Sequence, residues 1–407
     1  MLYNSWEATT FAVDVVGQMA LTEKASRPGV ERFVVDDGWF KGRNSDHAGL
    51  GEWTPDPAKF PNGLKPLIDK VHGLGMEFGL WVEPEMVNPN SDLYRAHPDW
   101  VIDFPDRPRT PARNQLMLNL ARTDVRDHLF KVLDELLTRN DIQYIKWDYN
   151  RKISEPGWPE VGADQQQTLY VEYVRNLYWI FEQLRKRHPH VEFESCSGGG
   201  GRIDLGIMAL TDQVWPSDNT DPYERLAMQD NFTHAFTPAV MMAWVTDSPN
   251  WANKRSTSLE YRFLSSMAGG LGIGADLNHW DAQDMAVATQ MVAAYKQIRA
   301  TVQQGERYRL IPATTGGRRS ATLSVAGDKR QAALFLYQTS GVRSDNPFAV
   351  QLQGLDPQRR YRISRIGGGE LPAGTPEEAS GAYWMQHGVG LEMTGDLQAR
   401  GYVLQAR

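Results

Sequence analysis

Short apolar segments alternate with longer helical patterns along most of this 407-residue chain, and this alternation constrains the fold more than any other feature. Eight segments have the near-continuous apolar character of strands that are buried on both faces. They span residues 2–8, 32–39, 77–84, 115–122, 143–150, 191–198, 213–220 and 240–247. Eight strands joined by helical crossovers predict an α/β protein with a (β/α)8 TIM barrel, which we expect over residues 1–305.

Amphipathic patterns between these segments predict the helices. In residues 127–140 the apolar side chains fall on one stripe, as in a helix that covers a sheet. Residues 168–188 form a longer pattern whose last turn is basic, which suits the C-terminal end of a helix. Residues 63–75 form a shorter pattern of the same kind.

Polar side chains gather at one end of the predicted strands. In chain order they are Asp36, Asp37, Trp81, Glu83, Asp148, Asp218 and Asp247. In a (β/α)8 barrel the C-terminal ends of the strands form the face that carries the active site. The sequence therefore predicts a site at this face.

The character of the sequence changes near residue 306. A long helical pattern after residue 281 comes before the change, and short alternating segments separated by Gly, Pro and Asp follow it. These segments span residues 318–327, 330–339, 347–355, 359–367 and 399–406. They predict a second domain over residues 306–407, a small antiparallel β-sandwich.

Composition narrows the classes of function. The net charge is −7 without basic clusters, so we expect neither nucleic acid nor a membrane as a partner. The sequence has no apolar run of 18 residues and no pattern of a secretory leader, and its single cysteine, Cys196, excludes an internal disulfide. We therefore expect a cytoplasmic protein. Twelve of the 13 tryptophans lie before residue 281, and their faces suit either a core or the faces of sugar rings.

Asp148 is the first catalytic candidate. It follows an apolar strand, and Lys146, two residues earlier, points to the same side of that strand. The lysine charge would lower the pKa of Asp148 and keep it ionised, as a nucleophile requires. A structural Asp–Lys pair at the barrel mouth gives the same pattern, so the residues alone leave both roles open.

Asp218 is the second catalytic candidate, and Asp221 competes with it. Asp221 precedes Pro222 and a helical pattern, which predicts a helix N-cap with proline at the first helical position. Asp218 lies nearer the end of the strand. Two carboxylates on one barrel face, with tryptophans nearby, fit glycoside hydrolysis.

Asp36 and Asp37 allow two interpretations, a Mg²⁺ site or a pair of acceptors for sugar hydroxyls. We favour the sugar, and expect no metal or other cofactor, because no histidine or third acid has ligand spacing. The four glycines 198–201 lack the pattern of a phosphate loop and predict a backbone that approaches a ligand closely. Cys196 has no histidine near it in the sequence, so we expect a small buried side chain rather than a nucleophile.

Eight motifs taken together resemble the α-galactosidases, or melibiases, of glycoside hydrolase family 36. The resemblance runs colinearly over residues 2–280 and continues loosely through the C-terminal segment. The motifs are NSWEAT, VVDDGWF, AGLGEW, FGLWVEPEMV, RNQLMLNL, YIKWDYNR, ESCSGGGGRID and SDNTDPYERL.

The resemblance implies a retaining α-galactosidase that removes terminal α-D-galactose from oligosaccharides such as melibiose and raffinose. Asp148 matches the family's nucleophile and Asp218 its acid/base. Asp36 and Asp37 match the acceptors for the axial 4-OH and the 6-OH. The other residues expected to bind substrate are Trp6, Trp81, Arg113, Lys146, Trp147, Tyr149, Asn150, Cys196, Ser197, Gly198 and Gly199.

The chain departs from the family pattern in two places. Family members usually carry a large N-terminal β-sandwich domain ahead of NSWEA, the motif at which this chain begins. The segment AWVTDSPN, residues 243–250, replaces a more usual version that contains histidine.

Several alternatives remain open at this point. Within the class they are an α-N-acetylgalactosaminidase, for which Cys196 beside the 2-OH leaves little room, and a transglycosylase of the raffinose-synthase kind. From other classes they are a Mg²⁺-dependent lyase built on Asp36, Asp37 and Asp148, and a catalytically silent galactose-binding fragment. The expected partners are α-galactoside oligosaccharides and further copies of the chain in a homo-oligomer.

Overall fold

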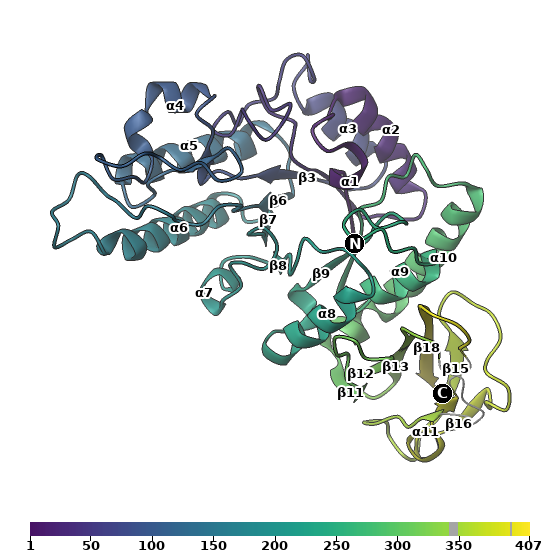
Figure 1. Cartoon of the computed structure of the whole chain (residues 1–407). Helices are drawn as coiled ribbons and strands as arrows, with labels where there is room; N and C mark the ends of the chain where they lie inside the picture. The colour runs from purple at the N-terminus through teal and green to yellow at the C-terminus, as the bar shows by residue number, and fades with distance from the viewer. Residues whose placement is uncertain (342–348, 391–392) are drawn as a thin grey trace. The chain divides into compact units, whose positions relative to one another are not determined.

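The computed structural model describes residues 1–341, 349–390 and 393–407, which form two compact units. The N-terminal unit comprises Leu2–Ser26 and Glu31–Asp218, and the C-terminal unit comprises Met1, Arg27–Val30 and Asn219–Arg407. Figure 1 labels many of their helices and strands. Both catalytic candidates and every expected substrate-binding residue belong to the N-terminal unit.

Six parallel strands form the main sheet of the N-terminal unit. They are β1 (Leu2–Asn4), β2 (Arg32–Val35), β3 (Glu77–Val82), β6 (Tyr144–Trp147), β7 (Glu192–Ser195) and β8 (Gln213–Val214). Their spatial order is β8-β7-β6-β3-β2-β1, and Lys146 lies in register between Trp81 on one side and Glu194 on the other. Nearly all strand residues are buried, as expected for strands with both faces covered.

Helices follow these strands in the sequence, as the amphipathic patterns predict (Figure 1). Helix α5 (Thr123–Arg139) packs beside α6 (Thr168–Arg187), where the rings of Phe130 and Trp179 meet edge to face at 5.4 Å. On α6, the ring of Phe181 packs against Trp147 of β6. The other helices of the unit are α1 (Trp6–Thr9), α2 (Val15–Ser26), α3 (Lys65–Gly73), α4 (Asp92–Ala96), η1 (Pro98–Trp100) and α7 (Leu205–Met208).

The C-terminal unit contains two further parallel strands, β9 (Met242–Val245) and β10 (Gly270–Ile273). Its helices are α8 (Glu224–Ala235), η2 (Pro238–Val240), α9 (Leu259–Ser266) and α10 (Ala282–Gln304). Asp281 and Asp284 form a capping box that begins α10, the long helix predicted after residue 281. Eight described strands thus pair in parallel, and the predicted (β/α)8 fold is confirmed.

One of the eight predicted barrel strands is wrong. Within residues 115–122, only Leu116–Met117 form a strand, β5, and it pairs antiparallel with β4 (Met86–Val87) in a small separate sheet. The segment is apolar because its side chains are buried, and burial alone does not identify a barrel strand.

The strand missing from the prediction is β10. Two of its four residues are glycines, Gly270 and Gly272, which weaken the strand pattern in the sequence. The structure gives Gly270 a packing reason, since a Cβ there would lie 2.5 Å from the sulfur of Met242 on β9. Close contact between β9 and β10 therefore explains why position 270 is a glycine, although glycine weakens the strand pattern in the sequence.

The end of the chain forms an antiparallel sheet of six strands in the order β11-β12-β13-β18-β15-β16. These are β11 (Glu306–Ile311), β12 (Arg319–Val325), β13 (Gln331–Gln338), β15 (Arg360–Arg365), β16 (Glu378–Ser380) and β18 (Gln398–Ala406). A two-stranded sheet, β14 (Ala349–Val350) with β17 (Val389–Gly390), and helix α11 (Gly381–His387) accompany it. The first two residues of the predicted segment 347–355 lie outside the described residues.

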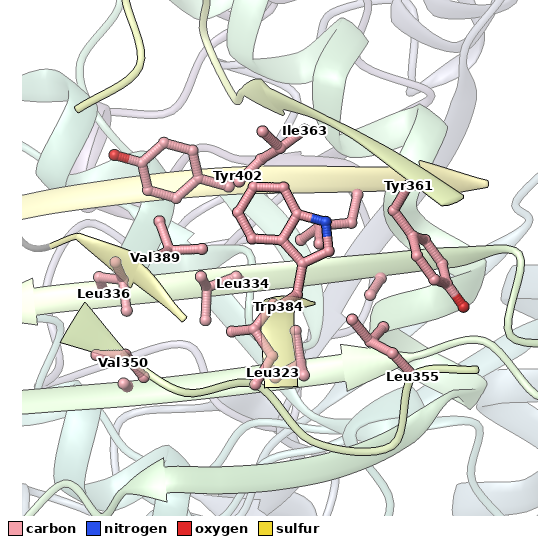
Figure 2. Close-up of a cluster of buried hydrophobic side chains, with 14 of the residues drawn as sticks. Leu323, Leu334, Leu336, Val350, Leu355, Tyr361, Ile363, Trp384, Val389 and Tyr402 are labelled. Carbon is pink, nitrogen blue, oxygen red and sulfur yellow. The ribbon is translucent and has the colours of Figure 1, made fainter. Parts of the chain in front are cut away.

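The two C-terminal sheets share one hydrophobic core. Figure 2 shows the fully buried indole of Trp384, from α11, among Leu323, Leu334 and Ile363 of the large sheet. Val350 and Val389 of the small sheet belong to the same cluster. Side chains of two antiparallel sheets that meet in one core agree with the predicted sandwich. Across the parts of the chain that the structure describes, no helix is long and apolar enough to cross a membrane.

Candidate active site

Asp148 lies directly after β6, and its carboxylate accepts hydrogen bonds on both oxygens. Oδ1 accepts from the backbone N–H groups of Tyr149 (2.8 Å) and Gly198 (3.3 Å). Oδ2 accepts from the indole of Trp81 (3.2 Å) and the side-chain amide of Asn150 (2.7 Å). Four donors from three segments fix the orientation of this buried carboxylate.

The surroundings favour the ionised form of Asp148. Burial opposes ionisation, but the positive charge of Lys146 and hydrogen bonds from Cys196 and Asn150 outweigh it and hold the pKa of Asp148 below its ordinary value. Burial and the charge of Asp148 raise the pKa of the Cys196 thiol well above its usual range, so the thiol stays protonated and can donate. An ionised, oriented carboxylate is chemically fit to act as a nucleophile.

Asp218 has the opposite electrostatic character. It follows β8 by four residues, is exposed, and accepts a hydrogen bond from the indole of Trp215 over 2.9 Å. Partial loss of water around the carboxyl and the negative charge of Asp148 raise the pKa of Asp218, against the opposing effect of Lys146. Two carboxyl groups whose pKa values move apart are the arrangement that separates an acid from a base.

The glycine segment 198–201 contacts both the Asp148 carboxylate and the backbone of the segment that carries Asp218. Gly198 donates to Asp148. Gly199 has φ +87°, and a Cβ there would lie 2.9 Å from the backbone nitrogen of Asp218. A Cβ on Gly200 would lie 2.5 Å from the carbonyl oxygen of Pro216. The predicted close approach of this backbone is therefore to the Asp218 segment itself, which no larger residue would allow.

Asp36 and Asp37, which follow β2, are each paired with a buried cation. Asp36 Oδ2 accepts from Lys146 Nζ (2.8 Å) and Asn4 Nδ2 (2.7 Å). Asp37 receives a bidentate pair from Arg43, with Nε 2.9 Å from Oδ1 and Nη2 2.8 Å from Oδ2. In the described ranges, no group of three or more His, Cys, Asp and Glu side chains could hold a metal ion.

Asp221 is held in a different way from Asp218. Its buried carboxylate accepts from Arg255 and from Asn253 (2.6 Å), both in the C-terminal unit. The predicted N-cap role is supported by its contacts, although regular α8 begins at Glu224. The carbonyl of Asp221 accepts from the N–H of Arg225 (2.9 Å), and its carboxylate accepts from the N–H of Tyr223 (3.2 Å), as at an N-cap with Pro222 at the first helical position. Its carboxylate is thus committed to structure.

Comparison with known families decides the class of the chain. The profile described as melibiase matches residues 1–305, and the profile of the glycosyl hydrolase family 36 C-terminal domain matches residues 319–404. The chain belongs to glycoside hydrolase family 36.

Individual melibiases of this family are similar over nearly the whole chain. Alpha-galactosidase AgaA of Geobacillus stearothermophilus is 38% identical, over 90% of this chain and 50% of its own length. The crystal structure of AgaA has a TM-score of 0.95 and covers 100% of this chain and 55% of that one. An alpha-galactosidase of Escherichia coli is 37% identical, over 95% of this chain and 56% of its own. The chain spans about half the length of these relatives.

The remaining residues that the family resemblance implies lie in several settings. Trp81 is buried and stacks parallel to Phe40 at 6.2 Å, whereas Trp6 is half-buried and meets Phe11 edge to face at 5.4 Å. Arg113 is exposed and has φ +53°, and its charge acts on Asp218. Ser197 is nearly buried beside the glycines.

The structure separates the members of the melibiase motif KWDYN. Tyr149 and Asn150 are half-buried, and Asn150 donates to Asp148. Trp147 is fully buried against Phe181, and its indole donates to Glu85 over 2.8 Å. The prediction that Trp147 binds substrate is therefore wrong, because alternate residues of a strand point to opposite faces and Trp147 faces the helix layer.

The sequence predicts no role for three residues that the structure places in this candidate site: Asn4, Arg43 and Glu83. Asn4 and Arg43 pair with Asp36 and Asp37, and nothing in their local sequence announces it. Glu83 directly follows β3, so its position at a strand end already predicted that it lies on the active-site face. Its buried carboxyl accepts from the Asn150 backbone (2.6 Å) and from Gln115 (2.8 Å), and burial together with the charge of Asp148 raises the pKa of Glu83 to about 8.

Proposed function

We propose that this chain is a retaining α-galactosidase that hydrolyses terminal non-reducing α-D-galactose from oligosaccharides such as melibiose and raffinose. The observation that carries the proposal is the placement of Asp148 and Asp218 against one glycine segment, beyond the C-terminal ends of β6 and β8 of the barrel. Their surroundings support it, because they lower the pKa of Asp148 and raise that of Asp218. Relatives with this name support it, and structures of AgaA variants in complex with raffinose and stachyose support the substrate class.

The proposed reaction has two displacements. The Asp148 carboxylate attacks the anomeric carbon while Asp218 gives its proton to the departing glycosidic oxygen, and a covalent galactosyl-enzyme forms. Asp218, now ionised, then takes a proton from water, and that water breaks the ester to Asp148 and releases α-galactose. The proton on Asp218 is restored at the end of the cycle.

The proposed selectivity for galactose rests on Asp36 and Asp37. Both carboxylates are buried, and both would accept hydrogen bonds from the axial 4-OH and the 6-OH. A glucoside, whose 4-OH is equatorial, would not form this hydrogen bond to the buried carboxylate, and loss of a buried hydrogen bond discriminates between epimers. Lys146 donates to Asp36 and would also contact the sugar hydroxyls that Asp36 binds. Trp6, Trp81, Arg113, Tyr149 and Cys196 to Gly199 complete the proposed sugar site.

The remaining parts of the proposal concern the whole protein. We divide the chain into a catalytic barrel, residues 1–305, and a β-sandwich domain, residues 306–407. A homo-oligomeric state and a cytoplasmic location stay predictions. The names of the relatives favour hydrolysis over transglycosylation, and the cation partners of Asp36 and Asp37 favour sugar binding over a Mg²⁺-dependent lyase.

Hydrolysis of p-nitrophenyl α-D-galactoside by the purified chain tests this proposal. We expect release of nitrophenol, with α-galactose as the first anomer seen by NMR. The β-galactoside and the α-glucoside serve as matched controls and should not react. Release of β-galactose first would indicate inversion, and loss of activity with a chelator would favour the lyase. No turnover of any α-galactoside would favour the silent binding fragment.

A further inference from the structure

Glu85 is a fully buried carboxylate whose four hydrogen-bond contacts converge from three segments of the N-terminal unit. Oε1 accepts from the indole of Trp147 (2.8 Å) and from Arg202 Nη1 (2.8 Å). Oε2 accepts from the hydroxyl of Tyr173 on α6 (2.6 Å) and again from Arg202 Nη1 (3.1 Å). A carboxylate offers about four acceptor positions, so Glu85 is saturated by protein donors.

These contacts hold the residues on both sides of Asp148. Trp147, directly before it, is bound by Glu85 itself. Tyr149, directly after it, lies under the guanidinium of Arg202, whose central carbon is 4.7 Å from the ring centroid. Arg202 needs Glu85 because the guanidinium is largely buried and its charge has to be balanced.

Arg202 also ends the glycine segment. Gly198, four residues earlier, donates to Asp148 Oδ1, and Gly199 packs against Asp218. Glu85 and Arg202 therefore join Trp147, in the segment that carries Asp148, to the glycine segment, which packs against the backbone of Asp218. Helix α6 anchors the pair through Tyr173.

We propose that Glu85, acting through Arg202 and Trp147, is a positioning residue for Asp148. The inference rests on the proposed function of Asp148 as nucleophile. Glu85 reaches no substrate, since all its acceptor positions are taken by protein groups. Its effect is to fix the carboxylate direction that attack on the anomeric carbon requires.

Glu85→Gln tests the proposal, because the change keeps the size of the side chain and removes the charge that holds Arg202. We expect kcat for p-nitrophenyl α-galactoside to fall about 100-fold, the typical result of misplacing a reacting group by about 1 Å, and KM to change less than about threefold. The matched control is Asp212→Asn, which breaks another arginine–carboxylate pair of this unit, with Arg185 Nη1 at 2.8 Å, and should keep kcat.

A second variant guards against misfolding, because removal of one partner from a buried ion pair is strongly destabilising. Glu85→Gln combined with Arg202→Met leaves no unpaired charge and should fold, yet it should show the same loss of kcat. Parent kcat in either folded variant would overturn the proposal.

Crystal structures of the parent and of Glu85→Gln separate this inference from the proposed function. We expect the Tyr149 ring to move and the hydrogen bonds from Tyr149 and Gly198 to Asp148 to lengthen. If the parent does not hydrolyse α-galactosides, the proposed function fails, while this displacement would still show that Glu85 positions Asp148. An unchanged Asp148 carboxylate in the variant would overturn the positioning role.

Discussion

Lys146 Nζ donates to Asp36 Oδ2 over 2.8 Å, and both side chains are almost completely buried. The lysine charge also lowers the pKa of Asp148, two residues along the chain. One cation therefore serves a proposed sugar-binding acid and the proposed nucleophile together. Asp36 and Asp148 raise the pKa of Lys146 against the effect of burial, so it stays charged across the physiological range.

Replacement of this cation should move the acid limb of the activity profile. In Lys146→Met the pKa of Asp148 should rise, because the lysine charge is gone and only the hydrogen bonds to the carboxylate still oppose the effect of burial. Activity should thus be lost at a higher pH than in the parent, and kcat/KM at neutral pH should fall about 10²–10³-fold. The pH dependence of kcat/KM measures both effects.

Lys65→Met provides the control for this prediction. Lys65 forms an exposed pair with Asp69 (2.7 Å) on α3, and pairs of this kind contribute little. Its profile should match the parent's. An acid limb that stays in place in Lys146→Met would mean that Lys146 does not control the ionisation of Asp148.

The alternation of strands and helices was enough to predict the barrel, because parallel strands buried on both faces leave a strong apolar signal. It could not choose among buried segments. Leu116 and Met117 are as apolar as a barrel strand, but they form a small antiparallel pair with Met86 and Val87. Strand β10 could not be predicted, because its close packing against Met242 requires glycine at position 270, and glycine is typical of turns rather than strands.

The site shows the same division between local and tertiary information. Asp148 and Asp218 could be chosen from the sequence because they follow strands whose ends meet on one face. The partners of Asp36 and Asp37 could not be chosen from the sequence, because Asn4 and Arg43 come close to these two acids only in the folded chain. The family resemblance implied a substrate contact for Trp147, but strand alternation directs its side chain to the face opposite that of Lys146 and Asp148.

Gly199→Ala should impair the approach of the glycine segment to Asp218. The backbone is left-handed at φ +87°, and the new Cβ would lie 2.9 Å from the nitrogen of Asp218. We expect a loss of about 1–3 kcal/mol in the free energy of unfolding, measured by urea titration. Because Asp218 would be displaced, kcat for raffinose should fall more than kcat for p-nitrophenyl α-galactoside, whose leaving group needs little protonation.

Gly42→Ala is a matched control for the strain of placing an alanine in a left-handed backbone conformation. Gly42 has φ +73°, and a Cβ there meets nothing within 4 Å. Gly42→Ala should lower the free energy of unfolding by about 1 kcal/mol. It should leave unchanged the ratio of kcat for raffinose to kcat for p-nitrophenyl α-galactoside. Equal effects of the two substitutions on that ratio would contradict the proposed contact.

Glu83 should make stability depend on pH. Burial and the charge of Asp148 raise its pKa from 4.5 to about 8 in the folded chain, so the folded state holds a proton that the unfolded state has released. Stability from this group is complete below pH 4.5 and is lost as pH rises through about 8. In Glu83→Gln this loss, on the order of a few kcal/mol, should disappear.

Urea midpoints of parent and Glu83→Gln at pH 5 and pH 8 measure the effect. The parent should lose more stability than the variant between the two values. Glutamine keeps the oxygen that accepts from Asn150, so the variant should remain folded. If the parent and Glu83→Gln lose the same stability between pH 5 and pH 8, Glu83 is already ionised at pH 5.

The roles of the two aspartates separate by chemistry. Asp148→Gly should abolish turnover of α-galactosides, and added azide should partly restore the reaction. Azide would occupy the space of the missing carboxylate and attack from the same face, so the product should be β-galactosyl azide, which NMR identifies.

Asp218→Ala should instead keep the first step for substrates with good leaving groups. Because the second step has lost its base, galactosyl-enzyme should accumulate, and mass spectrometry detects it. The parent with azide should give galactose alone. If Asp148→Gly hydrolyses the aryl galactoside as fast as the parent, Asp148 is not the nucleophile.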